Sequence, residues 1–519
     1  MAHHWTLIVL FSGYLPLALT ILFTVSFAWF YTRRYASETQ HSCLSLITVI
    51  SGLSFSLLTC LLIPIDVFFA SYAKLHNGTF ADWAKNGTLL QDVEDTLEGT
   101  YFAFYSIVLI YLFLILPFVY FYSEYQTDPI LESSFAQSFR RAILYTSVFP
   151  LALGVMLTMG AIIPMRQNSH NATDWDWIRH ELVDNKGQDA FGFAFSILSA
   201  LGVCTLILYL GLGMMAFPLS LIRGFASAAK ERVNLREQQE NLKARIAVLK
   251  GRIQMRNASQ EDYQILAELT EEEAQLLRHE RYVAEFQATW TYRLRRMIRP
   301  VQMIFGFMGL SLSLLVVVSL LLSNVDKVTN SDANSGYVLK LATLPNPIDY
   351  ILLECQKFLS LDYVFFGSLI SYLVVCCIFS IQRFGIWCCC FKAYSIRRGR
   401  TLPQALIMMC GILILCVFGL NILIYAISPQ YTTFGSQHYI LNDTIRPCDF
   451  DAPPHECIQT RATSLLNRFN YRMAVFGFGY YWLSWLFILV SVGGYFVFQF
   501  RSRISVAGQR DEEEDDLME

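Results

Sequence analysis

The sequence predicts an all-α, polytopic membrane protein with about nine transmembrane helices and a cytoplasmic helical hairpin. Hydrophobic residues make up 54% of the 519-residue chain and charged residues only 16%, so the apolar surface exceeds what one soluble core could hide. Nine apolar runs are each long enough to cross a bilayer as a helix. One long polar stretch, 223–300, interrupts these runs and forms the other main part of the chain.

The predicted spans form two membrane regions, with five spans in residues 1–222 and four in residues 301–499. No Lys or Arg falls inside the span limits, and all nine His lie outside them. This distribution argues against an intramembrane proton relay or metalloprotease, since both need ionisable groups that converge within the bilayer. Whether a further re-entrant helix lies within 341–360 stays open. The predicted spans are 5–31, 42–73, 100–122, 142–165, 189–222, 301–323, 361–381, 401–428 and 473–499.

Orientation follows from the first span and from the glycosylation sequons. No Lys or Arg precedes the first apolar run and Arg33-Arg34 follows it directly, which is typical of a retained anchor with a lumenal N-terminus. Nine spans then place the acidic tail, 500–519, in the cytoplasm. A sequon at Asn257 lies on the cytoplasmic stretch and should stay unmodified. Four others fall in predicted lumenal loops and are expected to carry glycans: Asn77, Asn86, Asn171 and Asn442.

Apolar residues in the polar stretch recur every seven positions, which is the spacing that lets a helix pack against one partner. Leu235, Leu242 and Leu249 form one series. Ser259 and Asp262 then have the spacing of a capping box, which starts a new helix. We therefore expect an antiparallel hairpin, the alternative being one long helix that forms a parallel coiled-coil homodimer. The second series comprises Leu269, Leu276, Val283 and Trp290.

Two groups of cysteines are candidates for modification. Cys448 and Cys457 are the only pair in one predicted lumenal loop, 429–472, where an oxidising environment favours a disulfide between them. The second group follows a span end on the predicted cytoplasmic side, which suits S-palmitoylation, although small apolar filler at a helix end is an equally good interpretation. It comprises Cys388, Cys389 and Cys390.

Asp66 is a carboxylate well inside a predicted span, and it follows Pro64. Proline leaves a backbone carbonyl free, and a carboxylate beside it could contact a polar ligand or a partner helix. An interfacial or capping group is the alternative. The sequence offers no metal-ligand cluster, no bound cofactor, no phosphate loop of the GxxxxGK[ST] kind and no basic nucleic-acid face, so we expect neither an enzyme nor an ATP-driven pump.

Three short patterns resemble endosomal sorting signals that clathrin adaptors read. Tyr263 and Leu266 have the spacing of a tyrosine-based signal, and Leu276-Leu277 follow two glutamates as in an acidic dileucine signal. Leu517-Met518 form a weaker match in the acidic tail. Adaptors bind such signals in extended form, whereas the first two patterns fall within the predicted hairpin. Packing inside the hairpin is therefore the alternative explanation for both.

Several short stretches together resemble one known family, the LMBR1-domain membrane proteins. The resemblance runs from the second predicted span to the last predicted lumenal loop. It rests on Pro64-Ile-Asp-Val-Phe68, Asn77-Gly-Thr-Phe-Ala-Asp-Trp83, Pro117-Phe-Val-Tyr-Phe-Tyr122, Ile396-Arg-Arg-Gly-Arg-Thr-Leu-Pro-Gln-Ala-Leu406, Pro429-Gln-Tyr431, Gly435-Ser-Gln437 and Cys448-Asp-Phe-Asp-Ala-Pro453.

The resemblance implies a multipass protein of the lysosomal membrane that is needed for cobalamin to reach the cytosol, as an escort or a transporter. It also implies an ABC half-transporter as partner, and a possible second role in clathrin-dependent endocytosis at the plasma membrane. Where a relative has the tyrosine of an adaptor signal, this chain has Ala228-Ala229-Lys230, which weakens the endocytic expectation. The alternatives are a receptor-like endocytic adaptor and an independent channel or lipid-handling protein.

Overall fold

The structure is a computed structural model that describes most of the chain. It describes residues 2–37, 42–75, 77–85, 87–127, 135–162, 188–223, 228–254, helical pieces within 265–281, 290–331, 336–337, 343–357, 361–388, 391–397, 399, 401–441, 444–453, 456–471 and 473–500. The chain divides into two compact units. The first unit comprises Met1–Met215 with Ser313–Gly494, and the second comprises Ala216–Leu312 with Tyr495–Glu519.

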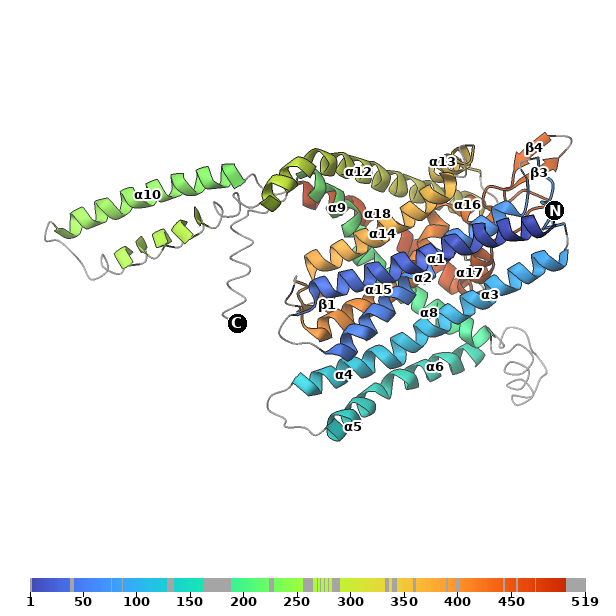
Figure 1. Cartoon of the computed structure of the whole chain (residues 1–519), viewed down its shortest axis with the longest axis horizontal. Coiled ribbons are helices and arrows are strands. Elements are labelled where there is room, and N and C mark those ends of the chain that lie inside the picture. The colour runs from blue at the N-terminus through green and yellow to red at the C-terminus, as the bar shows by residue number, and fades with distance from the viewer. Residues whose placement is uncertain are drawn as a thin grey trace. The chain divides into compact units, whose positions relative to one another are not determined.

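Helices dominate both units, and two short β-hairpins accompany them (Figure 1). In the first half of the chain the elements are α1 (Ala2–Tyr35), α2 (Cys43–Tyr72), α3 (Gly87–Ile110), the π-helical η1 (Tyr111–Ile115), α4 (Leu116–Thr127), α5 (Phe135–Thr146), α6 (Val148–Ile162), α8 (Gln188–Leu206), the π-helical η4 (Ile207–Gly211), α9 (Leu212–Arg223) and α10 (Ala228–Gln254). In the second half they are α12 (Trp290–Asn330), α13 (Pro347–Cys355), α14 (Leu361–Phe384), β1 (Ile386–Cys388), β2 (Phe391–Tyr394), α15 (Pro403–Ile427), α16 (Pro429–Phe434), β3 (His438–Leu441), β4 (Thr444–Pro447), α17 (Arg461–Asn470) and α18 (Ala474–Phe500).

Eight helical stretches among the described residues are long and apolar enough to cross a membrane, which confirms the prediction of an α-helical polytopic protein. The predicted first span falls on α1, a 34-residue helix, but the side chains of residues 2–17 lie outside the described set. The count of nine is therefore approximate. The eight stretches are Cys43–Tyr72, Gly87–Tyr125, Gln137–Ile162, Ala190–Arg223, Met297–Asn330, Leu361–Phe384, Pro403–Ile427 and Ala474–Gln499.

The core of the first unit lies around α15, most of whose side chains are buried. Gly202 of α8 and Gly419 of α15 meet where these two helices cross. A Cβ built on Gly202 would lie 2.3 Å from the carbonyl oxygen of Leu415, and one on Gly419 would lie 2.5 Å from the carbonyl carbon of Gly202. Since backbones approach this closely only where no side chain intervenes, the two glycines allow α8 to pack directly on α15.

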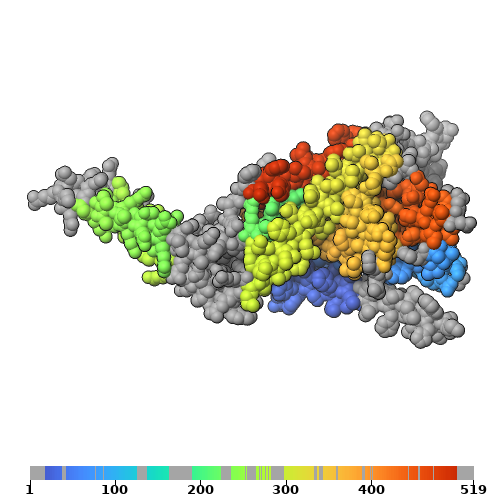
Figure 2. All heavy atoms as spheres, turned by 90° about the horizontal axis from the view of Figure 1, so that it is seen from above, coloured from blue at the N-terminus to red at the C-terminus, as the bar shows by residue number. Residues whose placement is uncertain are grey.

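The helices of the first unit are also joined by side-chain hydrogen bonds. In Figure 2, α12 (yellow) lies between α18 (red) and the golden segment of α13 and α14. Ser484 Oγ of α18 donates to Asn324 Oδ1 of α12 at 2.9 Å, and the hydroxyls of Ser313 and Tyr372 lie 2.6 Å apart between α12 and α14. Such bonds satisfy polar groups that lipid cannot, so they fix how neighbouring helices are paired.

The structure differs from the sequence expectation in two places. Helix α12 continues to Asn330 rather than ending at 323, so the helix also carries Lys327, which lies beyond the predicted span limit. Two antiparallel β-hairpins, β1–β2 and β3–β4, form where only loops were expected. These hairpins occupy short connections between helices, where the 3.6-residue and seven-residue periodicities used for prediction carry no signal.

The interval 341–360, which the sequence left open, contains the nine-residue helix α13. Asn346 caps it: the Oδ1 atom accepts a hydrogen bond from Ile348 N at 3.0 Å, and Pro347 occupies the first helical position, where its missing N–H costs nothing. Asn346 Nδ2 also donates to the carbonyl of Ile427 at 2.8 Å, which ties the start of α13 to the end of α15.

The second unit contains a helical hairpin. Figure 1 shows helical pieces within 265–281 running alongside α10. Arg236 Nε of α10 lies 2.7 Å from Glu280 Oε1, although 44 residues separate them. Leu235, Leu242 and Ile246 are each at most 7% exposed. This contact within one chain favours the antiparallel hairpin over one long helix.

Replacing Leu242 with Asp should destabilise this hairpin, because it puts a charge into the buried apolar contact at a cost of roughly 2–5 kcal/mol. Val248 of the same helix is 65% exposed, so Val248→Asp is the matched control and should change little. Limited proteolysis of the full-length protein in detergent would measure the effect as faster cleavage within 228–281. Equal cleavage rates for the two variants would place the packed face elsewhere.

Candidate functional site

Asp66 connects two parts of the chain that are almost 400 residues apart. Its side chain in α2 is 2% exposed. It accepts hydrogen bonds from Ala462 N at 2.6 Å, Arg461 N at 3.3 Å and the Tyr101 hydroxyl at 3.3 Å. Ala462 and Arg461 start α17, whose first N–H groups have no partner within the helix. The carboxylate therefore caps this helix from a neighbouring span, where the helix dipole favours negative charge.

Arg461 extends the contact to the start of α3. Its guanidinium forms an ion pair with Glu94 and lies 3.7 Å from Glu98 Oε2. All three side chains are between 23% and 27% exposed, so the charges are partly shielded from solvent. Helix α3 begins at Gly87, whereas the predicted span begins at 100. The two glutamates lie in this additional N-terminal part of α3, which thus supplies acidic partners for α17.

A second carboxylate, Asp349 of α13, makes a similar contact with α16. Its side chain is 3% exposed, Oδ1 accepts from Tyr431 N at 3.0 Å, and Oδ2 accepts from Gln430 N at 3.2 Å. Asp362 of α14 accepts from the Tyr431 hydroxyl at 2.9 Å. Burial raises the pKa of Asp349 to about 7, against the two backbone N–H groups, which favour the charged form.

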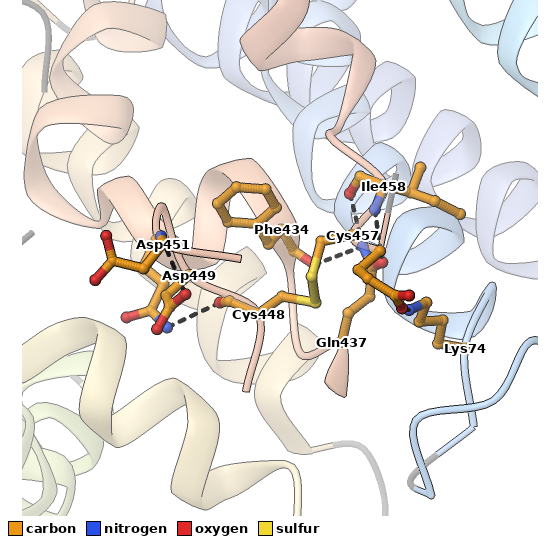
Figure 3. The surroundings of a disulfide bond; sticks show 10 residues. Lys74, Phe434, Gln437, Cys448, Asp449, Asp451, Cys457 and Ile458 are labelled. Atoms are coloured by element: carbon orange, nitrogen blue, oxygen red, sulfur yellow. Dashed lines mark hydrogen bonds and ion pairs between the residues drawn. A yellow bond between two sulfur atoms is a disulfide. The ribbon is translucent and has the colours of Figure 1, made fainter. Parts of the chain in front are cut away.

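The segment between α15 and α18 is also crosslinked internally. Cys448 and Cys457 form a disulfide with a Cα–Cα distance of 6.0 Å (Figure 3). Beside it, Gln437 Nε2 donates to the carbonyls of Phe434 and Ile458, both at 2.8 Å, while Ile458 N donates to Gln437 Oε1 at 3.0 Å. The glutamine side chain thus joins the end of α16 to Ile458, the residue that follows the disulfide loop.

Lys74 joins the end of α2 to this segment. Its side chain is buried, Nζ lies 3.5 Å from Glu456 Oε2, and it lies 4.8 Å from the centroid of the Phe80 ring. Burial lowers the pKa of Lys74, although the nearby Glu456 carboxylate acts in the opposite direction. Figure 3 shows Lys74 and the disulfide in one view. We call residues 429–471, with their disulfide, the capped segment.

The chemistry of these contacts is structural rather than catalytic. The carboxylates of Asp66 and Asp349 accept backbone N–H groups, and no group of three or more His, Cys, Asp or Glu among the described residues is arranged to hold a metal ion. The capping interpretation of Asp66 describes its observed contacts. A contact between Asp66 and a ligand or another protein stays a prediction.

Of the predicted glycosylation sites, Asn77 is described and exposed. Its Oδ1 accepts hydrogen bonds from Thr79 N at 3.2 Å and from the Thr79 hydroxyl at 2.7 Å. This tight turn leaves the asparagine at the surface, where a transferase could reach it. Asn86, Asn171 and Asn442 lie outside the described residues, as does Asn257. Glycosylation of all four predicted sites stays a prediction.

The other predicted modification and sorting residues are partly described. Cys388 ends strand β1 and pairs with Phe391 in a β-hairpin, so it does not lie at a helix end. Leu266, Leu276 and Leu277 lie on helical pieces and are half-buried, which agrees better with packing than with an extended signal. The residues outside the described set are Cys389, Cys390, Tyr263, Leu517 and Met518.

Lys327 is a residue that sequence reasoning missed. It lies in α12 within a candidate span, is 5% exposed and lines a small internal cavity. The predicted span ends at 323 because three of the next four residues, Asn324, Asp326 and Lys327, are polar. Polar residues at the end of an apolar run normally face solvent, whereas these three are buried by neighbouring helices.

These observations define a class: a polytopic α-helical membrane protein whose spans hold a disulfide-bonded segment through buried carboxylates. The sequence pattern of LMBR1-like membrane proteins matches residues 13–263. The similarity to curated proteins extends over nearly the full length, and the chain therefore belongs to the LMBR1-like membrane protein family. No solved structure matches it.

Three relatives illustrate this similarity. A Gallus gallus protein named "Lysosomal cobalamin transport escort protein LMBD1" is 34% identical over 529 residues, which cover 98% of this chain and 97% of the relative. The Homo sapiens protein of the same name is 34% identical over 523 residues, 97% of this chain and 96% of the relative. A Nematostella vectensis "Probable lysosomal cobalamin transporter" is 33% identical over 535 residues, 98% of this chain and 97% of the relative.

Replacing Asp66 with Ala should lower the unfolding temperature of the full-length protein in detergent by several degrees. The change leaves the buried N–H groups of Arg461 and Ala462 without an acceptor, at roughly 1–3 kcal/mol for each group. Asp82→Ala is the matched control, since Asp82 is exposed and contacts only Lys85 in the described structure. If both variants unfold at the same temperature, the capped segment does not depend on the Asp66 carboxylate.

Protonation of Asp349 should make the folded protein more stable at acidic pH than at neutral pH. Its pKa of about 7 in the folded protein lies above the ordinary value of about 4, so the folded state binds the proton more tightly than the unfolded chain. The Asp349 contribution is therefore complete below about pH 4 and is lost as the pH rises through about 7.

Thermal unfolding of Asp349→Asn and wild type between pH 4 and pH 8, values chosen to bracket the shift, would test this. We expect wild type to lose stability across the window and the variant to show a shallower slope. An Asp82→Asn control should keep the wild-type slope, because its carboxylate is exposed. Parallel slopes for Asp349→Asn and wild type would contradict the assignment.

Proposed function

We propose that this chain is a lysosomal membrane protein that assists the export of cobalamin to the cytosol as an escort. The single observation that carries the proposal is its similarity, over 97–98% of its length, to relatives whose names state this role. Similarity that spans both membrane regions and the hairpin supports a shared function better than a match to one part would.

We further propose that the N-terminus and the capped segment face the lysosomal lumen and that the C-terminus faces the cytosol. A disulfide between Cys448 and Cys457 persists best in an oxidising compartment, which supports this orientation. In the first unit, the N-terminal end of α1 lies at the same end as β3 and β4 (Figure 1). Asp349 would be largely protonated in an acidic lumen, which removes the cost of burying its charge.

An escort role fits the internal cavities better than direct conduction does. The cavity beside Leu53, Cys377 and Leu413 and the cavity beside Lys327 each offer about 20 Å³. A space of this size holds a water-sized molecule, far less than a corrinoid needs. A cavity of about 580 Å³ lies between α2, η1, α4, α5 and α6, but apolar side chains such as Leu44, Leu114 and Phe118 line most of it. These dimensions support assistance to another transporter.

The partner we propose is a lysosomal ABC half-transporter, which would supply the ATP site that this sequence lacks. The hairpin of the second unit is the proposed contact surface. Its outer face carries exposed apolar side chains, with Val248 at 65% and Ile265 at 45% exposed. Exposed apolar residues on a polar helix are typical of surfaces that bind another protein. The clathrin-adaptor alternative has less support, because Leu276 and Leu277 are half-buried on a helical piece.

Cells that lack the endogenous protein provide the test. Rescue with the wild-type chain should lower the free cobalamin retained in lysosomes, whereas a variant with 228–281 replaced by a Gly-Ser linker should fail and should not recruit the half-transporter. Val248→Asp should weaken recruitment while leaving the hairpin folded. Lys357→Met, a change at an exposed residue of another part of the chain, is the control and should rescue fully.

Two results would contradict the escort proposal. The first is full rescue by the linker variant at normal abundance and location, since the proposed contact surface is then dispensable. The second is cobalamin flux in proteoliposomes that contain this protein alone, which would make it a transporter.

A further inference from the structure

Lys327 is a cation buried inside the first unit. It lies three residues before the end of α12, and its side chain is 5% exposed. It lines a cavity of about 20 Å³ formed with residues of α8, α15 and α18 and with Tyr471. A buried ammonium in a membrane-spanning helix is costly unless an opposite charge or several acceptors compensate it.

Within the described structure, Lys327 Nζ makes no hydrogen bond or ion pair, so no carboxylate compensates its charge there. The adjacent Asp326 is engaged elsewhere: Oδ1 accepts from Asn330 Nδ2 at 2.6 Å and from the Thr343 hydroxyl at 2.7 Å, and Thr343 N lies 3.2 Å from both oxygens. The carboxylate thus serves the residues that follow α12. Within the described residues, the ammonium of Lys327, a residue that lines the cavity, is therefore left without a countercharge.

One further donor near Lys327 is unused within the part of the chain that the structure describes: the side-chain amide of Asn324. Asn324 lies one helical turn before Lys327; it is fully buried, and its Nδ2 has no hydrogen-bond partner. Its Oδ1 is already occupied by Ser484 Oγ at 2.9 Å, and Ser484 lines the cavity. Tyr480 also lines it, but its hydroxyl is used by the carbonyl of Ser196 at 2.9 Å and by Asn470 Oδ1 at 3.0 Å. Among the described residues, the neighbourhood therefore has an unused donor, Asn324 Nδ2, and a positive charge, Lys327.

We infer that Lys327 anchors a binding site for one small monovalent anion, of the size and charge of chloride. A halide supplies the countercharge that the buried ammonium lacks and accepts from several donors at once. The cavity has room for roughly one water-sized particle, which admits chloride or bromide and excludes phosphate, sulfate and organic carboxylates. Because such a bound ion stabilises only the folded state, it links the packing of α12 to α15 and α18 to the surrounding halide concentration.

The experiment uses the purified full-length protein in lipid nanodiscs. Radioactive chloride binding should saturate near one ion per chain, and unlabelled bromide should compete whereas gluconate should not. At equal ionic strength, chloride should raise the unfolding temperature above its value in gluconate by about 3 °C or more. Lys327→Met should abolish both the binding and the halide dependence. Lys357→Met, which removes an exposed lysine, should preserve them.

The wild-type measurement stands even if Lys327→Met does not fold, and Lys327→Gln then gives a second variant that keeps a polar side chain. Absence of saturable chloride binding to wild type would overturn the inference, with water as the occupant. Halide dependence that persists in a folded Lys327 variant would also overturn it, because the site would lie elsewhere. The test involves no cobalamin, so its outcome is separate from that of the proposed function.

Discussion

The first unit depends on how buried carboxylates meet the N-terminal ends of short helices. Asp66 and Asp349 come from helices far apart in sequence, yet both accept backbone N–H groups at the start of a helix in the capped segment. A carboxylate removed from water is unfavourable by itself, and unpaired N–H groups at a helix start are as well. When the carboxylate accepts these N–H groups, both unfavourable contributions are removed. Neither the buried carboxylate nor the short helix is therefore stable without this tertiary contact.

Hydrogen bonds inside the spans fall into two kinds with different consequences. Many hydroxyls donate to a carbonyl four residues earlier in their own helix, as Thr59 does to Phe55 at 2.8 Å and Ser54 does to Ile50 at 2.7 Å. These bonds allow polar residues in an apolar environment but select no partner. The bonds that join helices, such as Asn421 Nδ2 to the Tyr105 hydroxyl at 3.2 Å, are fewer and specify which helices are neighbours.

Two properties of the molecule bear on its function. The first unit is internally crosslinked by glycine-mediated helix packing, buried carboxylates and a disulfide, and the cavities beside Leu53 and beside Lys327 are water-sized. The hairpin is polar with exposed apolar side chains. These properties support the proposal that the chain assists another membrane protein and that the exposed apolar side chains of the hairpin take part in that contact.

The sequence by itself determined the class, most of the helices and the hairpin. Apolar runs such as 401–428 and the heptad with Leu242 are local signals, because helical hydrogen bonds and amphipathic faces are set by nearby residues. Tertiary structure alone decided that Asp66 caps α17, that Gly202 meets Gly419 and that α12 continues so that Lys327 is buried. These outcomes depend on residues tens to hundreds of positions away, and a single sequence records no such distances.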